Sequence, residues 1–388
     1  MKKKIVILGS TGSIGKTFLN IIKKDIDKNE ILLLMANKNI NEILKQIKIF
    51  KVKNIIISDK KSFEKIKIIL NGKKINIYNN FNSINEIFKN TKADYTLSAI
   101  AGLDGLKPTL NILKFTKKIA IANKESIICG WPLIQNNLLK YKTRFIPIDS
   151  EHFSIWSLIN DIKSINIEKV YITASGGPFI NYPLHKFNKI TVNQALKHPN
   201  WKMGKKITID SSTLMNKVFE VMEAKKIFNY KYDKLKILVH PDSYVHAIIK
   251  FKNGLTKILI HDTDMKIPIF NSFYSNFEKK IKTKKINLNI LNNLKFKEID
   301  TVKFPALKIL KKMPDNDSLF ETVIVSANDK LVNLFLNKKI SFNEISKYLL
   351  KISELSEFKK YKKIKAKNIE QILKLSDYVS LKVKDLTI

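Results

Sequence analysis

The alternation of short apolar runs with helical patterns over the first 150 residues constrains the fold more than any other feature. The apolar runs have the length of strands and are expected at 4–8, 31–36, 54–58, 75–78, 95–101 and 118–122. The segments between them, such as 13–24 and 60–70, carry apolar residues at helical spacing. Because strands that alternate with helices form a parallel sheet covered on both faces, the sequence predicts an α/β fold with a Rossmann-like domain over residues 1–149.

The pattern changes after this domain. Residues 150–285 are expected to form an α+β domain, with helices near 152–162 and 213–227 and strands near 168–174, 236–240, 244–251 and 255–261. Residues 286–303 are rich in Asn and Lys and are interpreted as a linker. Apolar residues then recur at helical spacing, which predicts a helical C-terminal domain over 304–388.

The formal charge of +37 favours nucleic acid or an anionic surface as a partner. The lysines are spread along the whole chain, however, as expected when an AT-rich genome biases tolerant surface positions. We therefore expect no specific nucleic-acid binding and keep a basic nucleic-acid-binding protein as an alternative. No stretch reaches the roughly 18 apolar residues that span a bilayer, and Cys129 is the only cysteine. A cytoplasmic protein without a membrane anchor is expected.

A glycine-rich turn, Gly9-Ser-Thr-Gly-Ser-Ile-Gly15, follows the first expected strand and opens a helix. Glycines allow the backbone to approach a pyrophosphate, and the start of the helix offers free N–H groups. The spacing is G-x-x-G-x-x-G, so an ordinary strand–helix turn is the alternative. Its place at the first strand of the series favours a dinucleotide site.

The end of the second expected strand indicates which dinucleotide binds. A site for NAD usually has an acidic residue here to bind the ribose 2′-hydroxyl, but this chain has Asn37, Lys38 and Asn39. A lysine between two amides suits a 2′-phosphate, so NADPH is the expected cofactor. The alternative is that Lys38 is one more surface lysine.

Two carboxylates, Asp149 and Glu151, follow the apolar stretch 145–148. In an extended segment residues i and i+2 share a face, so both could bind one hard cation such as Mg²⁺ or Mn²⁺. The alternative is that Asp149 or Ser150 caps the helix expected from 152.

A second polar cluster runs from Ser211 to Glu220 and is interpreted as a cap followed by a helix. Asn216, Lys217 and Glu220 lie on one face of that helix, where an amide and a lysine near the helix start would hold a phosphate. By spacing alone, Glu223 competes with Glu220 as a metal ligand.

Three further segments carry candidate residues. Ser175 opens a glycine turn with exposed N–H groups, and residues 198–204, with Trp201 and Met203, are interpreted as a lid over a ligand. Residues 123–126 follow the strand at 118–122, at the sheet edge where ligands bind in open parallel sheets.

Taken in order, these motifs resemble one family, 1-deoxy-D-xylulose 5-phosphate reductoisomerase. The resemblance covers essentially the whole chain and rests on GSTGSIG (9–15), ANKES (122–126), DSEH (149–152), SGGPF (175–179), HPNWxMG (198–204) and IDSSTLMNKxxE (209–220). It implies a homodimeric enzyme with an NADPH domain, a catalytic and dimerisation domain and a helical domain. It also implies conversion of 1-deoxy-D-xylulose 5-phosphate, a sugar phosphate, to 2-C-methyl-D-erythritol 4-phosphate in isoprenoid biosynthesis.

The resemblance also implies roles for single residues. The metal ligands would be Asp149, Glu151 and Glu220, which favours Glu220 over Glu223. The substrate would be bound by Lys124, Ser150, Ser175, His198, Ser211, Asn216 and Lys217. The cofactor would be lined by Thr11, Gly12, Ser13, Ile14, Asn123, Glu125 and Gly204, together with Asn37, Lys38 and Asn39.

The chain departs from the family pattern at a few positions. Asn37 stands where glycine is usual, Thr263 replaces a proline, and 325–329 read Val-Ser-Ala-Asn-Asp instead of Asn-Ala-Ala-Asn-Glu. The last change bears on packing in the helical domain. Another enzyme class, an NADP-dependent semialdehyde dehydrogenase, would need Cys129 as its nucleophile.

Overall fold

The computed structural model describes residues 1–159, 166–199, 201, 203–274 and 279–387. Contacts between residues divide the chain into two units. The first comprises Met1–Ser126, Pro132–Asp149 and Met265–Ile281, and the second Ile127–Trp131, Ser150–Asp264 and Lys282–Ile388. Among the described residues, no helix combines the length and the apolar character needed to cross a bilayer.

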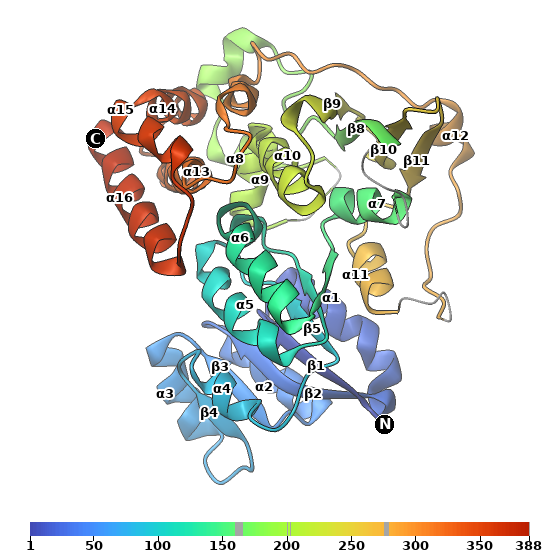
Figure 1. Ribbon diagram of the computed structural model, residues 1–388, viewed down its shortest axis with the longest axis vertical. Coiled ribbons are helices and arrows are strands. Elements are labelled where there is room, and N and C mark those ends of the chain that lie inside the picture. The colour runs from blue at the N-terminus through green and yellow to red at the C-terminus, as the bar shows by residue number, and fades with distance from the viewer. Residues whose placement is uncertain (160–165, 200, 202, 275–278, 388) are drawn as a thin grey trace. The chain divides into compact units, whose positions relative to one another are not determined.

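The first unit is built on a seven-stranded sheet in the order β4-β3-β2-β1-β5-β6-β7 (Figure 1). All neighbouring strands are parallel, which confirms the predicted α/β class. The strands are β1 (Lys3–Leu8), β2 (Asn29–Ala36), β3 (Asn54–Ile57), β4 (Asn76–Tyr78), β5 (Tyr95–Ser98), β6 (Lys118–Ile121) and β7 (Arg144–Pro147). The last strand was not predicted, because its four residues end in a proline and follow a long helix.

Helices α2, α3 and α6 of this unit begin where a side chain accepts a hydrogen bond from a free backbone N–H group. Asn39, Asp59 and Asn123 each accept a hydrogen bond from the backbone three residues on, at 3.1, 3.0 and 2.7 Å. The helices are α1 (Ser13–Ile22), α2 (Ile40–Phe50), α3 (Lys60–Ile69), α4 (Ser83–Ile87), α5 (Leu106–Ile112), α6 (Lys124–Tyr141) and α11 (Lys266–Phe273). Residues 127–131 of α6 group with the second unit.

An aromatic cluster joins α11 to α1 and β5, although more than 150 residues separate α11 from both in sequence. Phe273 lies edge-on to Phe18 and Tyr95, with ring centroids 5.2 and 5.0 Å apart. The buried hydroxyl of Tyr95 also shares a 2.7 Å hydrogen bond with Ser272. These contacts explain why residues 265–281 pack with the first unit.

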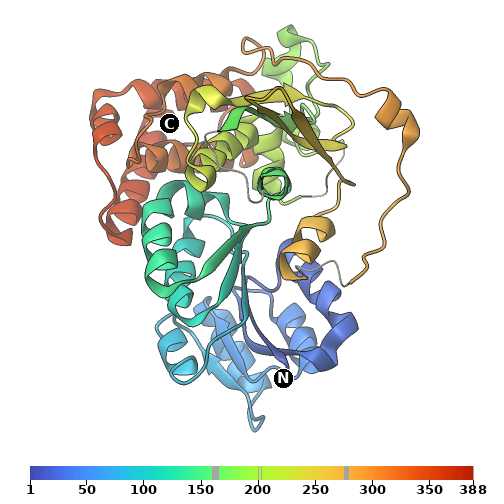
Figure 2. The same ribbon diagram turned by 45° about the vertical axis from the view of Figure 1, so that its right-hand side comes forward.

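The second unit holds a four-stranded sheet in the order β11-β10-β8-β9 (Figure 2). β8 and β9 are parallel, and the other two pairs are antiparallel, as expected of an α+β arrangement. The strands are β8 (Ile167–Ala174), β9 (Leu235–Val239), β10 (Val245–Phe251) and β11 (Thr256–Ile260).

The second unit contains helices on both sides of residue 304, and α13 to α16 confirm the predicted helical C-terminus. They are α7 (Ser150–Leu158), α8 (Val192–Ala195), α9 (Lys205–Ser212), α10 (Met215–Phe228), α12 (Leu288–Asn292), α13 (Phe320–Leu336), α14 (Phe342–Glu354), α15 (Ser356–Lys359) and α16 (Ile369–Thr387). Residues 160–162, which the sequence placed in the helix of α7, lie outside the described residues.

The helix predicted near 213–227 is confirmed as α10, but the serine cap predicted before it is wrong. Leu214 has a left-handed backbone (φ 59°), which ends α9 and lets α10 begin in a new direction. Ser211 therefore lies in the last turn of α9 and does not cap α10. The hydroxyl of Ser212 does not cap α10 either. It points toward preceding residues and shares its proton between the carbonyl oxygens of Ala195 and Thr208.

Helix α13 holds both α9 and α10 through polar contacts. Glu321 on α13 pairs with Lys226 on α10 at 2.6 Å, and both side chains are almost completely buried. Further along α13, Asn328 donates to Asp210 of α9 at 2.7 Å. Asp329, at a position that departs from the family pattern, pairs with Lys206 of α9. The altered segment thus keeps polar links between α13 and α9.

We expect Glu321→Gln to destabilise the second unit by about 3 kcal/mol, because the buried ammonium of Lys226 keeps only the partly exposed Asp317 as a carboxylate partner. Glu354→Gln is the matched control, since Glu354 pairs with Lys312 and Lys359 at the surface and its side chain is 46% exposed. Urea unfolding followed by circular dichroism measures both. Equal shifts in the two midpoints would show that the buried ion pair contributes no more to stability than the surface pair.

Candidate active site

The glycine turn of the first unit lies at the carboxyl end of β1, and its conformation requires glycine. Gly9 has φ 86°, and a Cβ there would lie 2.6 Å from the carbonyl oxygen of Ala99. A Cβ on Gly15, inside α1, would lie 2.5 Å from the carbonyl oxygen of Gly9. Gly12 and Ser13, at the start of α1, are exposed. The turn thus presents the open N-terminus of a helix to a ligand.

The segment that follows β2 carries an exposed lysine that could bind a negatively charged group. Lys38 is 75% exposed and lies 4.0 Å from Asp59, a weak surface pair that a phosphate could replace. Asn37 is also exposed. Asn39 is engaged differently, because its side-chain oxygen caps α2 through the backbone N–H of Glu42.

At the carboxyl end of β6, Asn123 is a buried structural residue. Its amide donates to the carbonyl of Gly102 at 2.6 Å and its oxygen accepts from Ser126. Lys124, the next residue, forms an ion pair with Asp149 in the same unit. The ammonium of Lys124 therefore compensates the charge of Asp149.

In the second unit, Lys217 bridges two acidic residues. Its ammonium donates to Glu151 of α7 and to Glu220 of α10. Burial opposes the charge on Lys217, but the two carboxylates outweigh burial and raise its pKa. Glu151 and Glu220 each offer an oxygen, and these two atoms lie within 4.8 Å of one another. This geometry confirms that the segments around 151 and 220 converge.

Two predicted residues support the bridge. Asn216 donates to Glu220, one turn further along α10. Ser150, buried at the start of α7, donates to Glu151. Carboxylate oxygens held by three donor groups are hard ligands suited to Mg²⁺ or Mn²⁺.

Glu223, the competitor of Glu220, faces a different partner. Its carboxylate lies 3.3 Å from Nδ1 of His152, and Nε2 of the same ring lies 2.8 Å from the carbonyl oxygen of Glu220. His152 thus links α7 to α10 directly behind the ligand-bearing turn. The sequence analysis found no signal at His152; its position directly after Glu151 was the only indication.

The glycine turn after β8 lies against the end of α9. Gly176 and Gly177 have φ 87° and 66°, and a Cβ on Gly177 would lie 2.8 Å from the carbonyl oxygen of Ser211. Ser175 is 3.3 Å from Nε2 of His198. Ser175 and His198 are therefore brought together, and the glycine turn that follows Ser175 contacts Ser211.

His198 is held as a neutral hydrogen-bonding group. Its Nδ1 accepts from the backbone N–H of Trp201 at 2.9 Å, so the proton of the neutral ring belongs on Nε2, which faces Ser175. Burial, with a smaller contribution from the Lys217 cation, lowers the pKa of His198 to about 4. The cation of Lys217 thus reaches the serine–histidine pair electrostatically.

Trp201 in the predicted lid lies near two stacked histidines that the sequence analysis did not connect. Its ring centroid is 6.4 Å from that of His246, which in turn stacks on His261 at 3.7 Å and 15°. Residues 200 and 202 of the lid lie outside the described residues. Gly204, at the end of the segment, precedes α9 and is exposed.

Together, a dinucleotide-type turn in one unit and buried carboxylates beside a phosphate-type lysine in the other define a class. The protein is an NADP-dependent oxidoreductase that uses a divalent metal and a small phosphorylated substrate. Three family models agree: 1-deoxy-D-xylulose 5-phosphate reductoisomerase at residues 5–130, and its C-terminal domains at 145–228 and 260–380. The chain belongs to the 1-deoxy-D-xylulose 5-phosphate reductoisomerase family.

Individual relatives support this membership over the full length. The chain is 60% identical to the 1-deoxy-D-xylulose 5-phosphate reductoisomerase of Pelagibacter ubique over 387 residues, with 100% of both chains covered. It is 38% identical to that of a Sulfurihydrogenibium species, with 92% of each covered. The Zymomonas mobilis enzyme in complex with NADPH has a TM-score of 0.88 at 29% identity, with 100% and 99% covered. A reductoisomerase with NADPH, fosmidomycin and magnesium also gives 0.88 at 27% identity, with 99% and 97% covered.

We expect the His198 ring of the free protein to stay neutral throughout the neutral pH range and to titrate near pH 4, because burial and Lys217 disfavour its cation. Histidine-selective NMR with assignment by His198→Asn measures this. Lys217→Met should raise the pKa by removing the neighbouring charge. A pKa near the ordinary value of about 6.5 would contradict the buried, cation-facing placement.

Proposed function

We propose that the chain converts 1-deoxy-D-xylulose 5-phosphate to 2-C-methyl-D-erythritol 4-phosphate with NADPH, in non-mevalonate isoprenoid biosynthesis. The observation that carries this proposal is the buried Glu151–Lys217–Glu220 cluster with Ser175 and His198 within electrostatic reach of its lysine. The carbon skeleton must rearrange before hydride is added, and both steps act on neighbouring oxygens of one small polyol. A site with carboxylates for a metal and cations for a phosphate holds both ends of such a molecule.

The metal ligands in this proposal are Asp149, Glu151 and Glu220. Glu151 and Glu220 share one ammonium, so a divalent cation would satisfy the same two carboxylates by direct ligation. Asp149 directly precedes Ser150, the first residue of α7. Only one residue therefore separates Asp149 from Glu151 in the sequence. When bound, Mg²⁺ or Mn²⁺ supplies Lewis-acid polarisation of the substrate oxygens.

The phosphate-binding group in this proposal consists of Ser175, Ser211, Asn216 and Lys217, with His198 beside them. Glu151 and Glu220 would hold the metal, and the ammonium of Lys217, which contacts both in this structure, would then be available to the phosphate at the start of α10. Nε2–H of neutral His198 orients the hydroxyl of Ser175. Lys124 and Ser150 complete the contacts to the sugar carbons. Phosphate binding then supplies energy remote from the reacting carbons.

The cofactor site in this proposal is formed by the turn 9–15 and the segment 37–39, with Asn123, Glu125 and Gly204 at the nicotinamide side. Thr11, Gly12, Ser13 and Ile14 offer the backbone N–H groups for the pyrophosphate. Lys38 binds the 2′-phosphate of NADPH. The residues 1–149 thus serve the cofactor, 150–285 the metal, the substrate and dimerisation, and 304–388 the support of α9 and α10, with 286–303 as linker.

The homodimer, the cytoplasmic location and the absence of a nucleic-acid role belong to the same proposal. β11 is an edge strand of its sheet, and Leu255 and Ile258 beside and within it are 60% and 43% exposed. A second copy of the chain would cover this apolar edge. The rival reading as a semialdehyde dehydrogenase is disfavoured, since Cys129 is buried within α6 and cannot meet a substrate.

Glu220→Gln should lower metal affinity and turnover by at least about 100-fold, because it removes a ligand oxygen of the Lewis-acid site. Glu223→Gln, the matched control on the same helix, should leave the metal dependence near normal, since Glu223 contacts His152. NADPH oxidation with the pentulose phosphate, titrated with Mn²⁺, measures both. Equal damage from the two variants would refute the ligand assignment. NADPH oxidation by the unaltered chain that needs no metal would refute the function.

Lys38→Ala should raise KM for NADPH by roughly tenfold and leave the KM for NADH unchanged, because only NADPH carries the phosphate that Lys38 binds. Lys65→Ala, at an exposed position of α3, is the control for a lost surface charge. Steady-state kinetics with both cofactors decide the point. A preference for NADH in the unaltered chain would contradict the proposed cofactor.

Trp201 should change its emission when the substrate or a phosphonate mimic binds, because the segment 198–204 closes as a lid and presses Trp201 toward His246. Trp201→Phe identifies the signal against the two other tryptophans. The same ligand should protect the segment from proteolysis. Emission and cleavage that stay constant at saturating ligand would mean that this segment is fixed.

A further inference from the structure

A pocket of about 900 Å³ opens in the first unit at the amino ends of its strands. Its lining includes residues at or just before the starts of four strands: Lys3 for β1, Asn29 for β2, Asp94 for β5 and Lys117 for β6. Tyr274 and Lys279, which follow α11, also line it. The glycine turn 9–15 lies at the opposite edge of the same sheet, about 20 Å away along β1. The proposed reaction therefore makes no use of this pocket.

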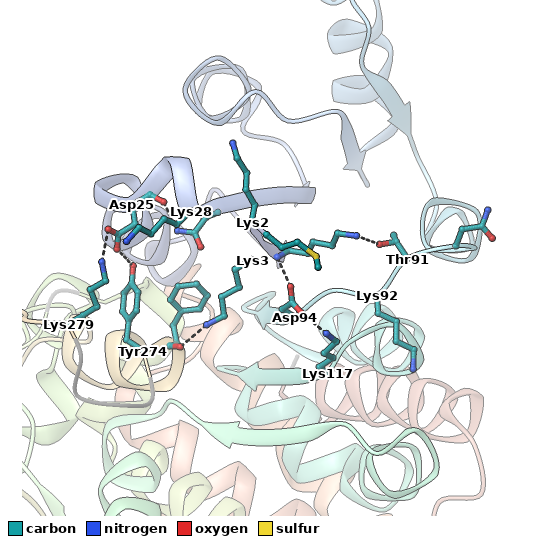
Figure 3. A pocket seen from close by; sticks show the side chains of 15 residues that line it. Lys2, Lys3, Asp25, Lys28, Thr91, Lys92, Asp94, Lys117, Tyr274 and Lys279 are labelled. Atoms are coloured by element: carbon teal, nitrogen blue, oxygen red, sulfur yellow. Dashed lines mark hydrogen bonds and ion pairs between the residues drawn. The ribbon is translucent and has the colours of Figure 1, made fainter.

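The pocket has a strong excess of positive charge. Seven lysines line it against two aspartates. Figure 3 shows that both aspartates are already neutralised, Asp25 by Lys279 at 2.9 Å and Asp94 by Lys117 at 2.8 Å. The pocket lining holds no further carboxylate for its other five lysines, which are Lys2, Lys3, Lys4, Lys28 and Lys92.

Two of these lysines have hydrogen-bond partners of different kinds. Lys4 donates to the hydroxyl of Thr91, and Lys3 donates to the carbonyl of Phe273 while lying over its ring. Neither partner carries a formal negative charge, although the ring of Phe273 attracts the ammonium of Lys3, and Asp94 partly offsets the effect of burial on the pKa of Lys3. Burial lowers the pKa of Lys3, which reflects the cost of an ammonium group held there. An anion in the hollow would relieve this cost.

We propose that this pocket binds a small polyphosphate anion, such as inorganic tripolyphosphate or the phosphate chain of a nucleoside triphosphate. The cations stem from separate elements around the hollow, at the starts of β1 and β2 and before β5, so several linked phosphoryl groups reach more of them than one phosphate does. The concave wall suits a flexible chain of phosphates better than a duplex, which needs a groove-sized surface. The site is additional to the cofactor and substrate sites.

The test uses the full chain with saturating NADPH, without divalent metal, and tripolyphosphate as the titrant in calorimetry at 0.15 M salt. The pocket variant combines Lys2→Gln, Lys28→Gln and Lys92→Gln. The control combines Lys65→Gln, Lys73→Gln and Lys74→Gln, three exposed lysines of the same unit that do not line the pocket. Both variants lose the same charge, so only the position differs. Normal turnover in each shows that the fold is intact.

We expect one tripolyphosphate per chain, a dissociation constant raised about tenfold in the pocket variant and less than about twofold in the control. Orthophosphate should bind the pocket far more weakly than tripolyphosphate. Equal weakening in both variants would mean a general effect of net charge and would overturn the site. Absence of saturable binding, or pocket-dependent binding of a duplex oligonucleotide that is tighter than tripolyphosphate, would overturn it as well.

Discussion

The ammonium of Lys217 between the carboxylates of Glu151 and Glu220 is the interaction on which the second unit depends. Three charged groups are buried here, and each would be costly alone. The lysine compensates both acids, which lets the two helices that carry them, α7 and α10, bring these charges together. A divalent cation would meet the same electrostatic demand.

The surrounding residues fix this arrangement from behind. His152 connects the carbonyl of Glu220 with the carboxylate of Glu223, so both ligand helices are held at the turn that carries the acids. The left-handed Leu214 separates α9 from α10 and places Ser211 against the turn at Gly177. Helix α13 then anchors α10 through Lys226 and Glu321. The geometry of the site thus rests on backbone breaks and buried pairs outside it.

Much of this could be predicted from the sequence, and the failures have physical causes. The strands of the first unit were found because a buried parallel strand is a continuous apolar run, and only the short β7 was missed. The family motifs brought the candidate ligands together by resemblance, and Glu220 and Glu223 could not be separated by spacing alone. In the structure their partners differ, since Glu220 pairs with Lys217 and Glu223 with His152.

The break at Leu214 and the return of α11 to the first unit were not foreseen. A left-handed leucine has no sequence signature, since that conformation is favoured mainly in Gly and Asn. The contact of Phe273 with Phe18 and Tyr95 is long-range, and local periodicity carries no information about it. The charge of +37 gave no guide to fold or function, although seven of the lysines line the pocket at the amino edge of the sheet, where we propose a further anion site.

The central claim is that one divalent cation replaces the ammonium of Lys217 between Glu151 and Glu220. Anomalous diffraction from crystals grown with Mn²⁺ tests it most directly. The account predicts one peak per chain within about 2.1 Å of oxygens from Glu151, Glu220 and Asp149, with the ammonium of Lys217 displaced from both glutamates. A peak at another place, or a Lys217 that still bridges both carboxylates at saturating Mn²⁺, would contradict it.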